Sequence, residues 1–167
     1  MTTPVAAGEA EHNRIDARHH AREAAVQMLY QWEVGHASVE DVADRFFRER
    51  SAPGPGDEDE HAEEAPVVLS AAQRVFALAL LRGVVANTGV LDPLIADAAQ
   101  HWRLERMAVV DRLILRIAVY EFQFLPVTPA RVVINEALEL ARTFSTEEAV
   151  RFINGLLDGI RKTLNRA

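Results

Sequence analysis

The sequence contains no cysteine, a single lysine and no apolar run long enough to cross a membrane. Without cysteine there are no disulfides, no thiolate nucleophiles and no cysteine-ligated metals. The longest purely apolar stretch, "VFALALL", lies between Arg74 and Arg82 and is far shorter than the roughly 20 residues of a spanning helix. The first 15 residues also lack the apolar segment of a secretory signal. We therefore expect a soluble, cytoplasmic protein with no membrane partner.

Charge is distributed unevenly along the chain. The 167 residues carry 25 acidic and 18 basic side chains, for a formal net charge of −7. Six of the acids lie in residues 51–66, a segment without lysine or arginine, so the rest of the chain is close to neutral. Positive charge gathers in residues 14–22 and 151–166, and all basic residues except Lys162 are arginine. Arginine grips phosphate bidentately and stacks on bases, which suits RNA, although a GC-rich genome produces the same bias.

Apolar residues recur at helical spacing along most of the chain and no segment alternates as a strand does, which predicts an all-α fold. About seven helices are expected, with starts near Ala17, Ser38, Ser70, Asp92, Met107, Thr128 and Ser145. Capping-box patterns support two of these starts, Ser70 with Gln73 and Ser145 with Glu148. Gly155 and Gly159, four residues apart in the last helix, are expected to let another helix approach closely.

Two segments are expected to lie outside this helical domain. Residues 1–15 are small, polar and aperiodic, which predicts a disordered N-terminal arm. Residues 51–66 are rich in proline, glycine and acids, which predicts a solvated insertion between two helices. The remainder, residues 16–167, is predicted to form one domain.

The motifs of enzymes and metal sites are missing from the sequence. None of the six histidines has the i, i+4 spacing of a metal-ligand pair with a nearby carboxylate. The sequence contains no G-x-S-x-G elbow, P-loop or glycine-rich dinucleotide turn. The carboxylates Glu136 and Glu139 are interpreted as a solvated helix face. We therefore expect no catalytic residue, no metal and no cofactor.

Two groups of residues suit the binding of a nucleic acid. On an ideal helix His19, Arg22, Val26 and Tyr30 fall within about 80° of one another, so hydrogen-bond donors and an aromatic share a stripe. Cations bind phosphates and aromatic rings stack on unpaired bases. Arg151 and Phe152, beside Glu148 at the start of the last helix, form a similar group near free backbone N–H groups. The alternative is that the arginines only aid solubility, Tyr30 is half-buried and Phe152 belongs to the core.

Three stretches together resemble the NusB family of bacterial transcription antitermination factors. They are "ARHHAREAAVQMLYQWEVG", "WRLERMAVVDRLILRIAVYEF" and "VVINEALELARTFSTEEAVRFINGLLDGI". The resemblance implies two three-helix sub-bundles plus a connecting helix. It also implies binding to the boxA element of nascent ribosomal RNA together with NusE, a ribosomal protein of the small subunit. This pair joins the RNA polymerase antitermination complex.

The resemblance assigns roles to particular positions. The RNA-binding positions fall on Arg18, His19, His20 and Arg22 in the first helix and on Glu148, Arg151 and Phe152 in the last. The positions that meet NusE fall on Tyr30, Glu105 and Asp111. We expect tertiary packing to bring the two RNA-binding groups side by side into one clamp. The second hypothesis is a protein-interaction module or homodimer that has no RNA-binding role.

Overall fold

The computed structural model describes the backbone of residues 5–51, 67–100 and 102–167, and side chains from residue 17 onward within these ranges. The described residues form six α-helices and one short 3-10 helix and contain no strand, so the all-α prediction is confirmed. In chain order they are α1 (Val5–Gly35), α2 (Val39–Ser51), α3 (Ala71–Ala99), η1 (Leu104–Arg106, the 3-10 helix), α4 (Val109–Phe124), α5 (Ala130–Phe144) and α6 (Glu147–Thr163).

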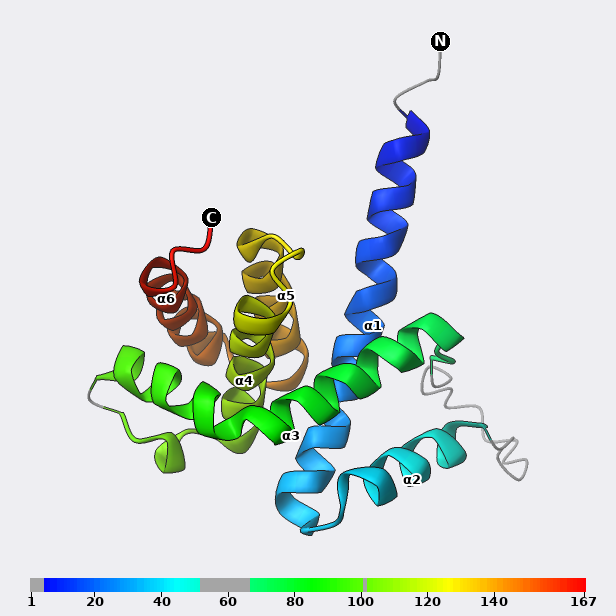
Figure 1. The fold of residues 1–167 in the computed structure, drawn as a ribbon, viewed down its shortest axis with the longest axis horizontal. Coiled ribbons are helices and arrows are strands. Elements are labelled where there is room, and N and C mark those ends of the chain that lie inside the picture. The colour runs from blue at the N-terminus through cyan, green and yellow to red at the C-terminus, as the bar shows by residue number, and fades with distance from the viewer. Residues whose placement is uncertain (1–4, 52–66, 101) are drawn as a thin grey trace.

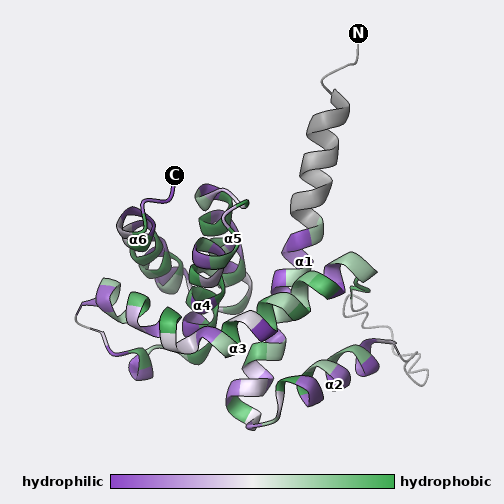
Figure 2. Ribbon diagram, viewed as in Figure 1, coloured by the Kyte–Doolittle hydropathy of each residue, from purple (hydrophilic) through white to green (hydrophobic). Residues whose placement is uncertain are grey.

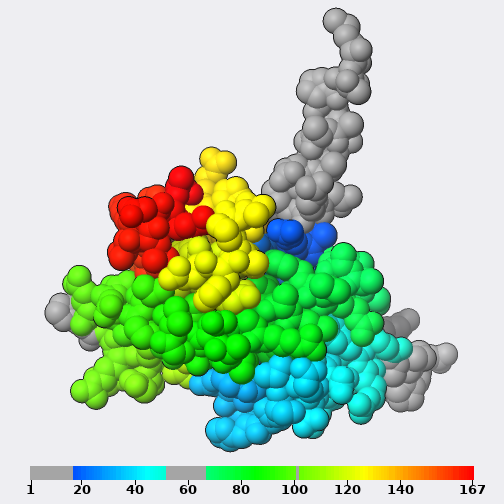
Figure 3. Space-filling view, viewed as in Figure 1, coloured from blue at the N-terminus to red at the C-terminus, as the bar shows by residue number. Residues whose placement is uncertain are grey.

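The long helix α3 connects the two halves of the molecule (Figure 1). One half consists of α1 and α2, and the other of α4, α5 and α6; α3 packs on α1, α2, α4 and α6. In the space-filling view α3 runs as a band between α2 and α6 (Figure 3). This arrangement is close to the expected pair of three-helix sub-bundles plus a connecting helix, with six α-helices in the described residues because α3 serves both as the third helix beside α1 and α2 and as the connection.

Helix α3 replaces two helices that the sequence predicts separately. The two segments join at a kink at Asn87, whose φ of −119° and ψ of 15° are not helical. The Asn87 side-chain amide donates to the carbonyl oxygen of Gly83, one turn earlier in α3, at 2.7 Å. The predicted helix start at Asp92 is wrong, because the Asp92 carboxylate accepts from Arg116 of α4 at 2.8 and 2.9 Å and caps no helix.

By length and composition alone, α3 is apolar enough to cross a membrane. Apolar residues line it along most of its length (Figure 2). Its fully buried residues Leu80, Leu81 and Val84 belong to the same core cluster as residues of α1 and α4. Only 28% of its apolar window is buried in the described structure, so α3 contributes one face to the core and leaves apolar residues such as Val75 and Val90 exposed.

The glycines of α3 and α6 differ in how closely other helices approach them. A Cβ atom at Gly83 of α3 would overlap the ring of Tyr120, so the absence of a side chain there allows α4 to approach. No atom lies within 4 Å of a Cβ placed at Gly155 or Gly159. Within the described part of the chain no other helix packs closely against Gly155 and Gly159, contrary to the prediction.

The two predicted capping boxes have different outcomes. Ser70 and Gln73 form the complete capping box at the start of α3, as predicted. At α6 the N-cap is Thr146, whose hydroxyl oxygen accepts from the backbone N–H of Ala149 at 3.1 Å, one residue later than predicted. Ser145 instead closes α5, and its hydroxyl donates to Asp111 at 2.6 Å.

Helix α1 begins upstream of the predicted start at Ala17, so the backbone of residues 5–15 is helical where the sequence predicts a disordered arm. The side chains of this part lie outside the described residues. Ser51, the first residue of the predicted acidic insertion, is the last residue of α2. Residues 52–66 lie outside the described residues, so the insertion stays a prediction.

Candidate nucleic-acid interface

The structure buries Arg22, which the sequence predicts to bind RNA. Only 1% of its surface is exposed. Its guanidinium donates two hydrogen bonds to the carboxylate of Glu121 on α4, at 3.0 and 2.6 Å, and lies 3.5 Å from Glu136 on α5. The prediction for Arg22 is therefore wrong. The reason is that the cation is needed inside the bundle, where it is the bidentate partner of a buried carboxylate.

His19 takes part in the same buried cluster. Its Nδ1 lies 2.9 Å from the Glu136 carboxylate and its Nε2 lies 2.8 Å from that of Glu23. Burial lowers the pKa of His19, but the hydrogen bonds and charges of Glu136 and Glu23 outweigh this effect and hold its pKa above the ordinary value. Glu136, expected on a solvated face, is only 7% exposed. His19 and Arg22 therefore lie among three carboxylates, those of Glu23, Glu121 and Glu136.

Of the predicted first-helix group, Arg18 and His20 stay at the surface. Arg18 is exposed, with its guanidinium 4.9 Å from the centre of the Phe76 ring on α3. The His20 side chain is 40% exposed and its Nδ1 lies 3.7 Å from Glu23. The predicted stripe of donors and an aromatic is not continuous, because Arg22 and Val26 both lie in the core.

The predicted group at the start of α6 lies at the surface. Glu148 and Arg151 are exposed and Phe152 is half-buried. Glu148 and Phe152 line a pocket of about 250 Å³ between the first turns of α6 and the segment that follows α3. Trp102 lines the same pocket, with its ring centre 6.3 Å from that of Phe152 in an edge-to-face contact. Phe152 is therefore accessible to a base, and is not sealed in the core.

Asp111, predicted to meet a protein partner, lines this pocket as well. Its carboxylate accepts from the hydroxyl of Ser145 at 2.6 Å. This bond ties the start of α4 to the junction that leads into α6. The structure thus brings one predicted protein-binding residue and two predicted RNA-binding residues to the same place. Glu105, the other predicted acidic residue, is exposed on η1.

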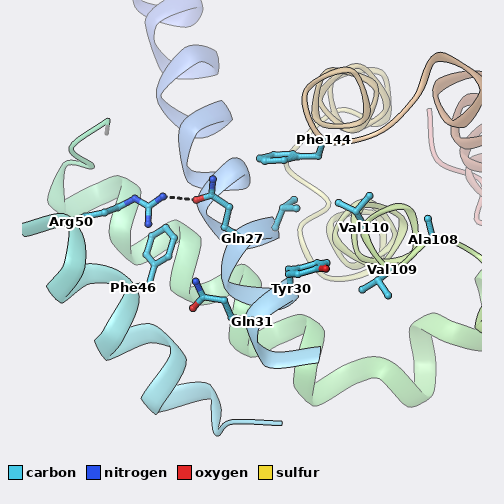
Figure 4. Close-up of a pocket in the computed structure, with 10 residues that line it drawn as sticks. Gln27, Tyr30, Gln31, Phe46, Arg50, Ala108, Val109, Val110 and Phe144 are labelled. Atoms are coloured by element: carbon cyan, nitrogen blue, oxygen red, sulfur yellow. Dashed lines mark hydrogen bonds between the residues drawn. The ribbon is translucent and has the colours of Figure 1, made fainter. Parts of the chain in front are cut away.

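Tyr30 lies in a larger, mostly apolar pocket of about 670 Å³ (Figure 4). Figure 4 shows its ring facing the space between α1, the start of α4 and the end of α5, with Phe144 on the opposite side. The tyrosine is 47% exposed. Ala108 lines both this pocket and the one at Phe152, so the two pockets adjoin. Tyr30 and Asp111 therefore belong to one continuous stretch of surface.

The two predicted RNA-binding groups do not meet in one pocket. The pocket at Phe152 contains no residue of α1. Helix α6 packs on α3, α4 and α5, whereas His19 of α1 contacts the middle of α5 through Glu136. The side-by-side clamp stays a prediction, because none of the residues described in this pocket belongs to α1.

A family model described as "NusB family" matches residues 19–162 of the chain. The chain belongs to the NusB family. The transcription antitermination protein NusB of Koribacter versatilis (strain Ellin345) is 43% identical over 152 residues, which cover 91% of this chain and 93% of that protein. The protein of the same name from Solibacter usitatus (strain Ellin6076) is 41% identical over 148 residues, covering 89% and 90%.

Solved NusB structures share the fold. NusB of T. maritima superimposes with a TM-score of 0.70 at 31% identity, covering 87% of this chain and 90% of that chain. A chain in the crystal structure of the antitermination factors NusB and NusE in complex with dsRNA has a TM-score of 0.73, covering 89% of this chain and 98% of its own. Because the two sequences are only 22% identical, this second similarity shows a shared fold and nothing more.

Two features of this NusB-family chain were not predicted from its sequence. It assigned no role to Trp102, although a tryptophan close to a predicted helix end and next to Arg103 is a detectable signal. It also treated Glu121 and Glu136 as ordinary helix residues, while both are buried partners of α1. A carboxylate that falls on the apolar side of a helix calls for a buried cation, and Arg22 supplies it.

Proposed function

We propose that this chain is an RNA-binding transcription antitermination factor. It binds the boxA element of nascent ribosomal RNA together with NusE, and the pair joins the RNA polymerase antitermination complex. The function is binding, not catalysis, and needs no cofactor; its place is the cytoplasm, where the RNA is made. The observation that carries the proposal is the family match over residues 19–162, supported by relatives named transcription antitermination proteins that align with nine tenths of the chain.

The RNA-binding surface of this proposal consists of Glu148, Arg151 and Phe152 at the start of α6. Arg18 and His20 of α1 contact the same RNA further along its chain. Phe152 offers an accessible ring on which a base can stack. Arg151 and Arg18 are exposed cations that suit phosphates. His19 and Arg22 act from inside the bundle, by holding α1 in place.

The NusE-binding surface of the proposal runs from Tyr30 to Asp111 and Glu105. The pocket at Tyr30 is lined largely by apolar residues, which suits a buried anchor from a protein partner. The two acidic residues answer the positive charge expected on a ribosomal protein, which normally lies on RNA. A crystal structure of a related fold that contains NusB, NusE and dsRNA supports the same pairing of partners.

The proposal is tested by fluorescence anisotropy with a labelled boxA oligonucleotide, with and without NusE. We expect Phe152→Ala to weaken RNA binding by about 5- to 150-fold, because loss of one stacked base costs about 1–3 kcal/mol. Phe124→Ala is the matched control, because Phe124 is also an exposed aromatic (43%) but lies at the end of α4, stacked on Tyr120.

The competing hypothesis, a homodimer or interaction module, predicts a different outcome. In that case no oligonucleotide binds at any NusE concentration, and size-exclusion chromatography shows a dimer whose population RNA does not change. The proposed site is contradicted if Phe152→Ala leaves the RNA affinity unchanged or if the protein does not bind RNA at all.

A further inference from the structure

Trp102 is a large apolar side chain that the fold leaves in water. It is 61% exposed, although an indole is among the side chains that gain most from burial. The turn that presents it contains Gln100 at a φ of 47°, a conformation that residues other than glycine rarely adopt. The backbone N–H of Trp102 donates to the carbonyl oxygen of Ala99 at 3.2 Å, which holds the tryptophan against the end of α3. An exposed aromatic held in this way is typical of a binding surface.

The pocket beside Trp102 has the size and the polarity for one nucleobase. Its volume of about 250 Å³ falls just below the roughly 300–1,000 Å³ of pockets for drug-sized ligands. Of its acidic lining residues, Asp111 already accepts from Ser145, whereas no described residue donates to the carboxylate of Glu148. A free carboxylate is an acceptor for the exocyclic amino group of a base.

The cations lie at the rim of this pocket. Arg106 lines it, and Arg103 and Arg151 directly follow and precede the lining residues Trp102 and Phe152 in the chain; all three are exposed, and none forms an ion pair with a described residue. Glu105 and Glu147 are exposed in the same region, so the surface is mixed in charge and not a simple anion site. A flat ring, a carboxylate acceptor and one arginine in the lining, with two further exposed arginines next to it in the chain, match a base with its flanking phosphates better than a free phosphate in the pocket.

We propose that Trp102 is a second stacking platform of the RNA site. A base of single-stranded RNA lies on the exposed face of its indole, while Phe152 supports the ring from its edge at 65°. Glu148 accepts from the amino group of that base, and Arg103, Arg106 and Arg151 hold the neighbouring phosphates. This inference rests on the proposed function, because it adds a residue to the same RNA-binding surface.

The experiment uses the full chain and a single-stranded RNA oligonucleotide that contains boxA. The chain has two tryptophans, so Trp32→Phe leaves Trp102 as the sole emitter. We expect RNA to quench the emission of Trp102 with the same midpoint as the anisotropy of labelled RNA. In the native background, Trp102→Ala should weaken binding by about 5- to 150-fold. Trp102→Phe should retain most of the affinity and Phe124→Ala all of it.

The outcomes separate this inference from the proposed function. If RNA binds but Trp102→Ala keeps full affinity and the emission is unchanged, the inference is wrong and the proposed function stands. If NusE alone quenches Trp102 and RNA has no further effect, Trp102 belongs to the protein interface and the inference is also wrong. If no variant binds RNA with or without NusE, the proposed function itself fails. Because Trp102 is mostly exposed, its replacement should leave the helical signal in circular dichroism unchanged.

Discussion

Replacing Arg22 with methionine would leave the carboxylate of Glu121 buried without its cation. Both side chains are 1% exposed, and two hydrogen bonds of 3.0 and 2.6 Å join them. Removal of one partner from such a pair costs about 3–5 kcal/mol, because the remaining charge is left without compensation. For a domain of this size each kcal/mol lowers the melting temperature by about 2–4 °C, so Arg22→Met should lower it by roughly 6–20 °C.

The assay is thermal and urea unfolding followed by far-UV circular dichroism at pH 7. The decisive variant is the double substitution Arg22→Met with Glu121→Met, which removes both charges and keeps most of the buried volume. Replacement of a buried ion pair by apolar residues is often neutral or stabilising, so the double variant should recover most of the stability that Arg22→Met loses. Arg18→Met is the matched control. Arg18 lies one turn earlier on α1 and is exposed, so its replacement should change the free energy of unfolding by no more than about 0.5 kcal/mol.

Two results would refute this reasoning. A melting temperature of Arg22→Met within about 2 °C of the wild type would mean that the guanidinium is not needed in the core and is free for RNA. A double variant as unstable as the single one would mean that the buried volume of Arg22, not its charge, stabilises the bundle. In the folded Arg22→Met protein, RNA affinity should stay close to that of the wild type.

Two further predictions concern stability. Folding raises the pKa of His19, so the contribution of its protonated form to the free energy of unfolding is fully present below the ordinary pKa of about 6.5 and is lost as the pH rises through the folded-state pKa. The destabilisation by His19→Gln, measured by urea unfolding, should therefore be larger at pH 6 than at pH 9. A destabilisation that does not depend on pH would contradict the cluster with Glu136. Gly83→Ala should destabilise the protein by about 1–3 kcal/mol, because its methyl group meets Tyr120. Gly159→Ala has open space around it and should stabilise the protein by up to about 1 kcal/mol. Equal effects of the two substitutions in thermal unfolding would refute the close contact at Gly83.

The helices could be predicted from the sequence because their signals are local. The spacing of Ala21, Ala25 and Met28 marked the buried face of α1, and all three are fully buried. The capping box of Ser70 and Gln73 was found at the predicted position, since it depends only on residues three apart. The break at Asn87 was predicted as well, and the structure has a kink with non-helical φ and ψ there, but the second segment resumes directly after Asn87 and not at Asp92.

The candidate site was predicted only in part, because side chains of the same type have different surroundings. Arg18 and Arg22 lie one turn apart in one basic segment, yet one is in water and the other is paired with Glu121. Helical periodicity places both near the edge of the polar face and does not show which one meets a carboxylate 99 residues further along the chain. For the same reason Trp102 could not be paired with Phe152, 50 residues away, before the turn after α3 was seen.

By itself the sequence determined the helical class, the helix faces and the family, because these depend on periodicity, capping and motifs that are local along the chain. The tertiary structure alone decided which charges stay available to a ligand. A buried carboxylate must find a cation inside the bundle, and α4 and α5 take Arg22 and His19 for this purpose. The surface that we propose for RNA consists of side chains that this internal pairing leaves accessible: Arg18 and His20 on α1, and Glu148, Arg151, Phe152 and Trp102 around the start of α6.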